Sequence, residues 1–177
     1  IPGTFNTAGN GLGFKLGLAA NSNQVTRIVR NNIAYKNRSW GFVENQALVG
    51  HVLSNNTAVS NGGLNFWFGS WGASRATIRN NISYLGGSVF DSATSAIFSD
   101  VSIVDHNSWD TAGIALNNSD FKSMDNSQLL RPRNSDGSLP TIDFLRLAPG
   151  SDLIDRGVNV GLPFNGAFPD IGASESP

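Results

Sequence analysis

A chain of 177 residues, of which 14% are charged and 40% hydrophobic, has the length of one domain or of one domain with an appended tail. This balance excludes a charge-rich disordered chain, a coiled coil and a collagen-like repeat. The net charge of −1 offers no basic field, so we expect neither nucleic acid nor a membrane as a partner. The chain has no cysteine, which excludes disulfides, Cys-ligated zinc and a thiol nucleophile.

The start of the chain, Ile1-Pro2-Gly3-Thr4, has no initiator Met and no signal-sequence pattern, which predicts a processed chain or a fragment.

Paired asparagines recur through the first two thirds of the sequence. The second asparagine of each pair recurs at intervals of 24, 25 and 26 residues, at Asn32, Asn56, Asn81 and Asn107. A set of apolar positions repeats with intervals of 28, 24, 24 and 24 residues, at Phe14, Phe42, Phe66, Phe90 and Ile114. Short alternating apolar segments between Asn, Gly and Ser are typical of strands and turns. The repeat therefore predicts an all-β, parallel β-helix of about four to five coils, with three short strands in each coil.

The repeated asparagine suits a sharp bend, because Asn tolerates the left-handed backbone and its amide can bond to the equivalent Asn in the next coil. We therefore expect an asparagine ladder. The apolar columns are expected to stack inside the coils as core residues. Besides the phenylalanine set they comprise Val29, Leu53, Ile78 and Val104 before the bend, and Ile33, Thr57 and Ile82 after it.

The repeat ends near residue 116, and the sequence that follows is rich in Asp, Ser, Pro and Gly. Because the end of a β-helix exposes strand edges and core, terminal segments commonly cover it. We expect residues 1–116 to form the coils, and residues 117–177 to form an irregular tail that packs on them within the same domain.

Side chains alternate along a strand, so the residue after each inward phenylalanine should point outward. This rule predicts an outward column of Lys15, Val43, Trp67, Asp91 and Ala115. Coils lie about 4.8 Å apart, a spacing that suits an extended saccharide chain. Trp67 could stack on a sugar ring, Asp91 is a candidate substrate contact, and Gly13 and Gly17 leave room for substrate beside Lys15.

Three further side chains complete the candidates. Arg38 precedes the Phe42 strand and is a candidate contact for a uronate carboxylate, and Asn45 follows the same strand as a candidate substrate contact. Glu44 and Asp91 make a poor glycosidase pair, because Glu44 should point inward and Asp91 outward. His51 and His106 have no Ser or Asp at a spacing that indicates a hydrolase triad.

The segment Asn10-Gly11-Leu12-Gly13-Phe14-Lys15-Leu16-Gly17 resembles the GNGFKLGG segment of polysaccharide lyase family 9, the pectate lyases and rhamnogalacturonan lyases. The next coil and the ending are similar to that family too, so the resemblance spans nearly the whole chain. The ending is carried by Arg131-Pro132-Arg133, Asp136-Gly137-Ser138-Leu139-Pro140, Gly150 to Val158 and Pro169-Asp170-Ile171-Gly172-Ala173.

The resemblance implies that the fold is a right-handed parallel β-helix and that Lys15 is the base of a β-elimination. It also implies Ca²⁺ on the substrate carboxylate, an acidic plant polysaccharide such as homogalacturonan or rhamnogalacturonan I as partner, and a secreted, bacterial protein. The aspartate cluster that holds Ca²⁺ in the family lies before the lysine. Here no Asp or Glu occurs before Glu44, so we expect no metal ligand in this chain, which corresponds to the C-terminal portion of a family member.

Two other functions remain open from the sequence. One is a non-catalytic β-helix module that binds acidic polysaccharide along the outward column. The other is a structural fragment without activity, whose open N-terminal end associates with another copy or awaits further coils.

Overall fold

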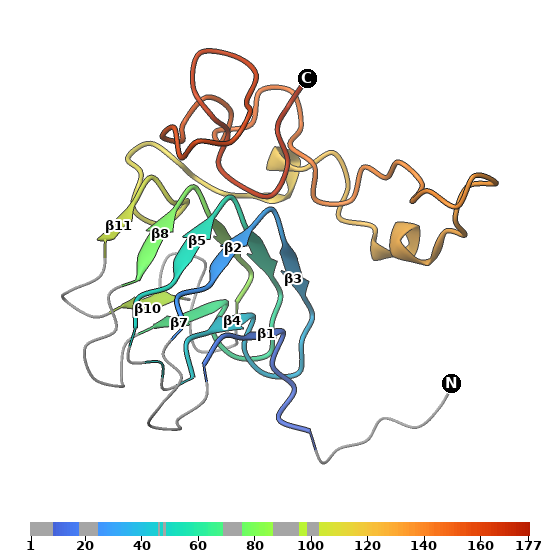
Figure 1. Cartoon of the computed structure of the whole chain (residues 1–177). Helices are drawn as coiled ribbons and strands as arrows, with labels where there is room; N and C mark the ends of the chain where they lie inside the picture. Colours follow the sequence, from blue (N-terminus) through green and yellow to red (C-terminus); the bar gives the residue numbers. More distant parts are fainter. Residues whose placement is uncertain are drawn as a thin grey trace.

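The computed structural model describes residues 9–17, 25–45, 47, 49–68, 76–86, 96–98 and 103–177. Its strands form three parallel sheets, named A, B and C below (Figure 1). Sheet A contains β1 (Phe14–Lys15), β4 (Phe42–Val43), β7 (Phe66–Phe68) and β10 (Ala96–Phe98); sheet B contains β2 (Ile28–Arg30), β5 (Val52–Ser54), β8 (Thr77–Arg79) and β11 (Ile103–Asp105); sheet C contains β3 (Ile33–Tyr35), β6 (Thr57–Val59) and β9 (Ile82–Tyr84). The chain passes through A, B and C in turn and returns to A one coil further along. This is the parallel β-helix that the repeat predicts, with three full coils and two strands of a fourth in the described residues.

A stack of aromatic rings runs through the interior behind sheet A. Ring centroids are 4.6 Å apart from Phe14 to Phe42 and 5.0 Å apart from Phe42 to Phe66. The expected fourth member, Phe90, lies outside the described residues, and the strand that pairs with β7 places Ala96 beside Phe66. Trp109 continues the stack instead, 5.2 Å from Phe66.

The register of the fourth coil therefore differs from the prediction. Phe66 and its partner Ala96 are 30 residues apart, whereas Phe42 and Phe66 are 24 apart. The prediction assumed loops of constant length, but loops in a β-helix change length without disturbing the strands they connect. Ile114, which was expected in the same column, lies outside any strand and packs against the tail.

Sheet B follows the prediction, because its strands pair Val29, Leu53, Ile78 and Val104 in one row that contributes to the coil interior. Sheet C does not. Ile33, Thr57 and Ile82 are paired in register as expected, but it is Ala34 and Ala58 that belong to the core inside the coils. Ile33 is 43% exposed, and Ile82 packs on the tail. The assumption of one apolar face failed because both faces of sheet C are apolar where a second layer covers the outer one.

The asparagine ladder is present, and the two asparagines of each pair divide its tasks. The first of each pair takes the left-handed backbone, with φ between 53° and 57°, at Asn31, Asn55 and Asn80, and His106 does the same in the last coil. The second asparagine makes the ladder. The backbone N and Nδ2 of each one donate to Oδ1 of the next, at 2.9 to 3.3 Å, from Asn32 through Asn56 and Asn81 to Asn107.

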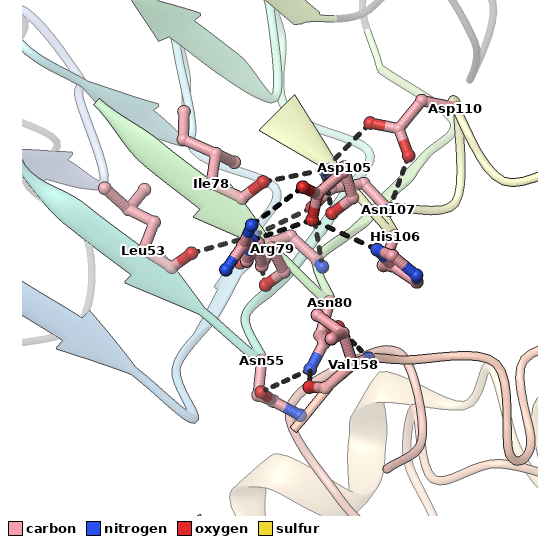
Figure 2. A network of polar contacts seen from close by, with 11 residues as sticks. Leu53, Asn55, Ile78, Arg79, Asn80, Asp105, His106, Asn107, Asp110 and Val158 are labelled. Atoms are coloured by element: carbon pink, nitrogen blue, oxygen red, sulfur yellow. Dashed lines mark hydrogen bonds and ion pairs between the residues drawn. The ribbon is translucent and has the colours of Figure 1, made fainter. Parts of the chain in front are cut away.

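The ladder ends at a carboxylate. The backbone N of Asn107 donates to Asp110 Oδ1 at 2.7 Å, and its Nδ2 donates to Asp110 Oδ2 at 2.9 Å (Figure 2). Each internal amide also donates to a main-chain carbonyl of the preceding coil, as Asn81 Nδ2 does to Leu53 O at 3.1 Å. Buried amides are thereby satisfied along the whole bend.

Residues 117–177 form an irregular tail with two short 3₁₀ turns, η1 (Asn118–Asp120) and η2 (Asn126–Leu130). The tail packs on the outer face of sheet C through one apolar cluster, which joins Val59, Ile82 and Tyr84 to Phe121, Phe144, Leu145, Leu147, Leu153 and Ile171. It is also bonded to the first asparagines, since Asn80 Nδ2 donates to Val158 O at 2.8 Å and Asn55 Nδ2 to Asp170 O at 3.2 Å. Among the described residues, no helix has the length and apolar character needed to cross a bilayer.

Candidate active site on the outer face of sheet A

Lys15 lies on the outer face of sheet A, at the end of the short strand β1. The preceding residue, Phe14, stacks inward on Phe42, and the following residue, Leu16, is buried in the same core. The Lys15 side chain is exposed. Two inward apolar neighbours therefore fix the strand, and the alternation of side chains directs the amine to the outside.

Two glycines bring β1 close to the following coil. A Cβ on Gly13 would lie 2.6 Å from Gly41 O, and a Cβ on Gly17 would lie 2.1 Å from Glu44 O. Both distances are far below van der Waals contact, so only glycine fits. We expected these glycines to leave room for substrate. The structure shows a different role, because they allow the backbone that carries Lys15 to approach the next coil.

The outward row beside Lys15 contains Val43 and then Trp67, as predicted for the second and third coils. Val43 is fully buried, however, so the row is not one continuous open surface. Trp67 is half-buried and its ring lies 4.7 Å from that of Trp40, with 31° between the ring planes. The outer face of sheet A thus carries a pair of indoles, with Trp40 one coil and Trp67 two coils from the coil of Lys15.

Trp40 was missed by sequence reasoning, although a signal for it existed. It lies just before β4, and its ring covers Gly63, whose Cβ would lie 2.3 Å from Trp40 Cδ1. A tryptophan in one coil opposite a glycine in the next indicates an indole lying flat on the sheet.

Arg38 and Asn45 both lie in turns beside β1. The exposed Arg38 lies against Gly11, where an added Cβ would be 2.7 Å from Arg38 Cβ. It is therefore close to the segment that carries Lys15. Asn45 takes a left-handed backbone and donates from Nδ2 to Gly17 O at 2.6 Å. Its amide group holds the turn that follows Lys15, and its role as a substrate contact stays a prediction.

The fourth and fifth positions of the outward column were predicted wrongly. β10 places Ile97, not Asp91, beside Trp67, and Asp91 itself lies outside the described residues. Ala115 belongs to no strand, and its backbone N donates to Asp152 in the tail. The cause is again the longer connection between β9 and β10, which shifts the register by six residues.

The described residues do not fit a calcium site. No three carboxylate or imidazole side chains converge anywhere in the described ranges. Glu44, the first acidic residue of the chain, is fully buried. Calcium prefers six to eight oxygen ligands, so the described part of this chain does not hold the ion beside Lys15, and we derive no step through it.

A second polar cluster lies on sheet B, away from Lys15. Arg79 forms a two-pronged ion pair with Asp105 at 2.8 and 2.9 Å, and His106 Nδ1 lies 3.0 Å from Asp105 Oδ1 (Figure 2). Burial tends to raise the pKa of Asp105, but the bonds and charges of Arg79 and His106 outweigh it and lower that pKa. The cluster joins the third and fourth coils.

The two histidines have different surroundings, because His51 is buried and His106 is exposed beside Asp105. His51 is buried, and its Nδ1 accepts a bond from the backbone N of Arg27 at 3.1 Å. Desolvation, together with the charge of Arg27, lowers the pKa of His51 and favours its neutral form.

The stacked coils define a parallel β-helix, and the outer face of its sheet A carries an exposed lysine and an indole pair. No family model matches the sequence. The chain is 39% identical over 173 residues to pectate lyase L of Dickeya dadantii (strain 3937), which covers 95% of this chain and 37% of that protein. It is 35% identical over 147 residues to pectate lyase PEL9 of Emericella nidulans, covering 82% and 34% of the two chains.

Solved structures agree. The crystal structure of pectate lyase Pel9A superposes with a TM-score of 0.81 at 34% identity, over 96% of this chain and 40% of that chain. A rhamnogalacturonan lyase superposes with a TM-score of 0.65 at 28% identity, over 83% and 38%. Along nearly its whole length this chain is therefore related to pectate lyases of polysaccharide lyase family 9, and it spans well under half the length of these relatives.

Proposed function

We propose that this chain carries the proton-abstracting base of a pectin-degrading polysaccharide lyase, and that Lys15 is that base. The observation that carries the proposal is the placement of Lys15: an exposed amine on a strand fixed by Phe14, Leu16 and two glycines, in a chain homologous to pectate lyases. No other Lys lies on a described strand of sheet A.

The reaction would be a β-elimination. The neutral amine of Lys15 takes the C5 proton of a galacturonate, and the electrons of that C–H bond form a C4–C5 double bond. The glycosidic oxygen leaves with the electrons of the C4–O bond and takes a proton from solvent. A carbon acid of this kind is weak, so a positioned base contributes about 10² to 10⁴ in rate.

The polymer would lie across the coils on the outer face of sheet A. Arg38, which lies against Gly11 in the segment before Lys15, would contact a uronate carboxylate. The Trp40 and Trp67 pair would offer an apolar surface for a sugar ring one to two coils away. The polymer is too large to enter a cell, so we propose that the protein acts outside it.

The test is the ultraviolet absorbance of the unsaturated product, with polygalacturonate and with rhamnogalacturonan I, with and without added Ca²⁺. Lys15→Ala should lower the rate by about 100-fold or more. Lys122→Ala, which removes an exposed lysine from the tail, is the matched control and should not change it. Equal rates for wild type and Lys15→Ala would contradict the proposal.

Gly17→Ala tests whether the close approach of β1 positions the base. The added Cβ meets Glu44 O at 2.1 Å, so the end of β1 must move and the rate should fall by about tenfold or more. Circular dichroism should show that the coils remain folded. An unchanged rate would show that the position of Lys15 does not matter.

The absence of a carboxylate cluster from the described residues favours a second function, a module that binds acidic polysaccharide without cleaving it. The same assay separates the two. Saturable binding of polygalacturonate that is weakened by Arg38→Ala, with no unsaturated product under any condition, would support the binding module and contradict the lyase.

A further inference from the structure

One part of the tail leaves the coils in a defined direction. Residues 122–146, called the arm below, begin and end at a bridge between Phe121 and Leu147. There the ring of Phe121 lies 5.6 Å from Tyr84 of the third coil. Further out, Ser123 bridges to Phe144, whose ring contacts Tyr35 of the first coil edge-on at 4.9 Å. The arm therefore crosses sheet C from β9 toward β3.

The arm continues past β3, on the side away from β11 (Figure 1). Residues 131–139 are all exposed. Their conformation is nevertheless built by bonds within the arm: Gln128 accepts from Asp143 N at 2.9 Å and donates to Ser123 Oγ at 2.8 Å, and Arg133 donates to Gly137 O at 2.8 Å. The base of the arm thus rests on the coils through Phe144, whereas its outer part is held by bonds within the arm.

Apolar side chains on the arm are exposed to an unusual degree. Leu130 is 86% exposed, Leu139 71% and Leu129 51%, and Ile33 on the neighbouring edge strand is 43% exposed. Single exposed leucines are ordinary, but three on one preformed arm beside an exposed edge strand mark an interaction surface.

The neighbouring strands are open in the same direction. β1, β2 and β3 are the terminal strands of sheets A, B and C. An open strand edge pairs readily with another strand. The chain matches only 37% of the length of pectate lyase L, so the relatives contain a large amount of chain beyond the matched part.

We propose that the arm is a clasp for further coils of the same β-helix, stacked on β1, β2 and β3. Their sheet C strands would continue the interface that the tail already makes with β9, β6 and β3, with outward apolar side chains against Leu129, Leu130 and Leu139. The inference depends on the fold and the family and is independent of the lyase activity.

Hydrogen exchange measured by mass spectrometry tests the clasp on two proteins as they exist. In this chain, peptides within residues 126–142 should exchange close to their intrinsic rates. In intact pectate lyase L of Dickeya dadantii, the segment that aligns with them should be protected by about tenfold or more. The segment that aligns with residues 159–168, an exposed loop elsewhere in the tail, is the internal control and should behave alike in both. Equal exchange of the arm in both proteins would overturn the proposal.

A chimera sharpens the test. When this chain replaces the matched part of pectate lyase L, the arm should gain the same protection. Leu130→Ser combined with Leu139→Ser should remove that protection, whereas Phe168→Ser, at a 58% exposed position of the tail, should leave it. Protection that survives the two leucine substitutions would count against the clasp.

Two other occupants have their own signatures in the isolated chain. Arm protection that grows with protein concentration, together with a dimer in sedimentation, would show that the arm binds a second copy. Protection on addition of oligogalacturonate would show a saccharide site around Arg131 and Arg133. Either result, without protection in the chimera, would overturn the proposal.

Discussion

The outer faces of sheets A and C differ in what covers them. Both continue the same coils, and both sheets turn apolar side chains inward. On sheet C the tail buries the outward row behind Phe121, Phe144 and Leu153, whereas on sheet A Lys15 remains exposed beside an indole pair. In this repeat, the covering layer decides which face stays available to a polymer.

The same contrast separates neighbouring residues at the bend. In each Asn pair the second residue bonds coil to coil, whereas the first, at Asn55 and Asn80, bonds chiefly to the tail and makes one 3.3 Å bond between coils, from Asn80 Nδ2 to Asn55 Oδ1. Two residues of one type, side by side, therefore support two different layers. Substitutions can address the coils and the tail separately.

Phe66→Ala should have the largest effect, because Phe66 lies between Phe42 and Trp109 in the aromatic stack and is fully buried. A cavity of this kind costs about 3 to 5 kcal/mol in the free energy of unfolding. Phe168→Ala, in the tail, should change it by less than about 0.5 kcal/mol. Urea unfolding followed by circular dichroism measures both, and similar losses would mean that the coils are not the stable layer.

Asn81→Ala and Asn80→Gly form a pair of intermediate effect. Asn81→Ala removes the acceptor of the buried backbone N–H of Asn56 and the side-chain donor to Leu53 O, which costs about 3 kcal/mol. Asn80→Gly suits the positive φ and removes the two bonds to Val158 and the longer one to Asn55, at about 1 kcal/mol. The first should lower the urea midpoint of the coils. The second should chiefly speed tryptic cleavage of the tail, and the reverse pattern would break the division between the two asparagines.

The smallest effects are on the pH dependence of stability, and they should have opposite signs in the two layers. Because the pKa of Asp105 is lowered, its ionised form stabilises the coils, and this contribution is lost as the pH falls through that pKa. Burial, with the charges of Asp170 and Asp155, raises the pKa of Glu175 in the tail. Its contribution is therefore lost as the pH rises through the raised pKa.

Unfolding by urea at several pH values checks both signs. Asp105→Asn should reduce the loss of stability in acid by about 0.2 to 1 kcal/mol, since the pair is partly exposed. Glu175→Gln should remove the loss on the rising side. A steeper acid loss in Asp105→Asn would mean that the ion pair does not stabilise the coils.

Much of the fold could be predicted from the sequence because the same pattern of residues recurs in successive coils. The register of Val29, Leu53, Ile78 and Val104 was predicted correctly, as was the bonding between second asparagines. Each of these positions sits at a bend or next to it, where the turn length is constant.

Three features were predicted wrongly or missed: the register of β10, the inward side of sheet C, and Trp40. The register of Ala96 against Phe66 depends on the length of the loop before β10, which no strand pattern encodes. The inward side of sheet C was misassigned because the tail makes an apolar outer face look like a core face. For the site, the flanks of Lys15 were informative, but Trp40 was missed because its contact, Gly63, belongs to the next coil.

The asparagine ladder has a polarity that limits how the structure can be extended. Every amide donates in the same direction, and at one end both oxygens of the Asp110 carboxylate accept from Asn107. At the other end, Asn32 Oδ1 accepts no bond from the described residues, so it can receive the amide of another coil. Asp110 therefore ends the asparagine ladder. A further asparagine, in an added coil, can join the ladder only at the Asn32 end.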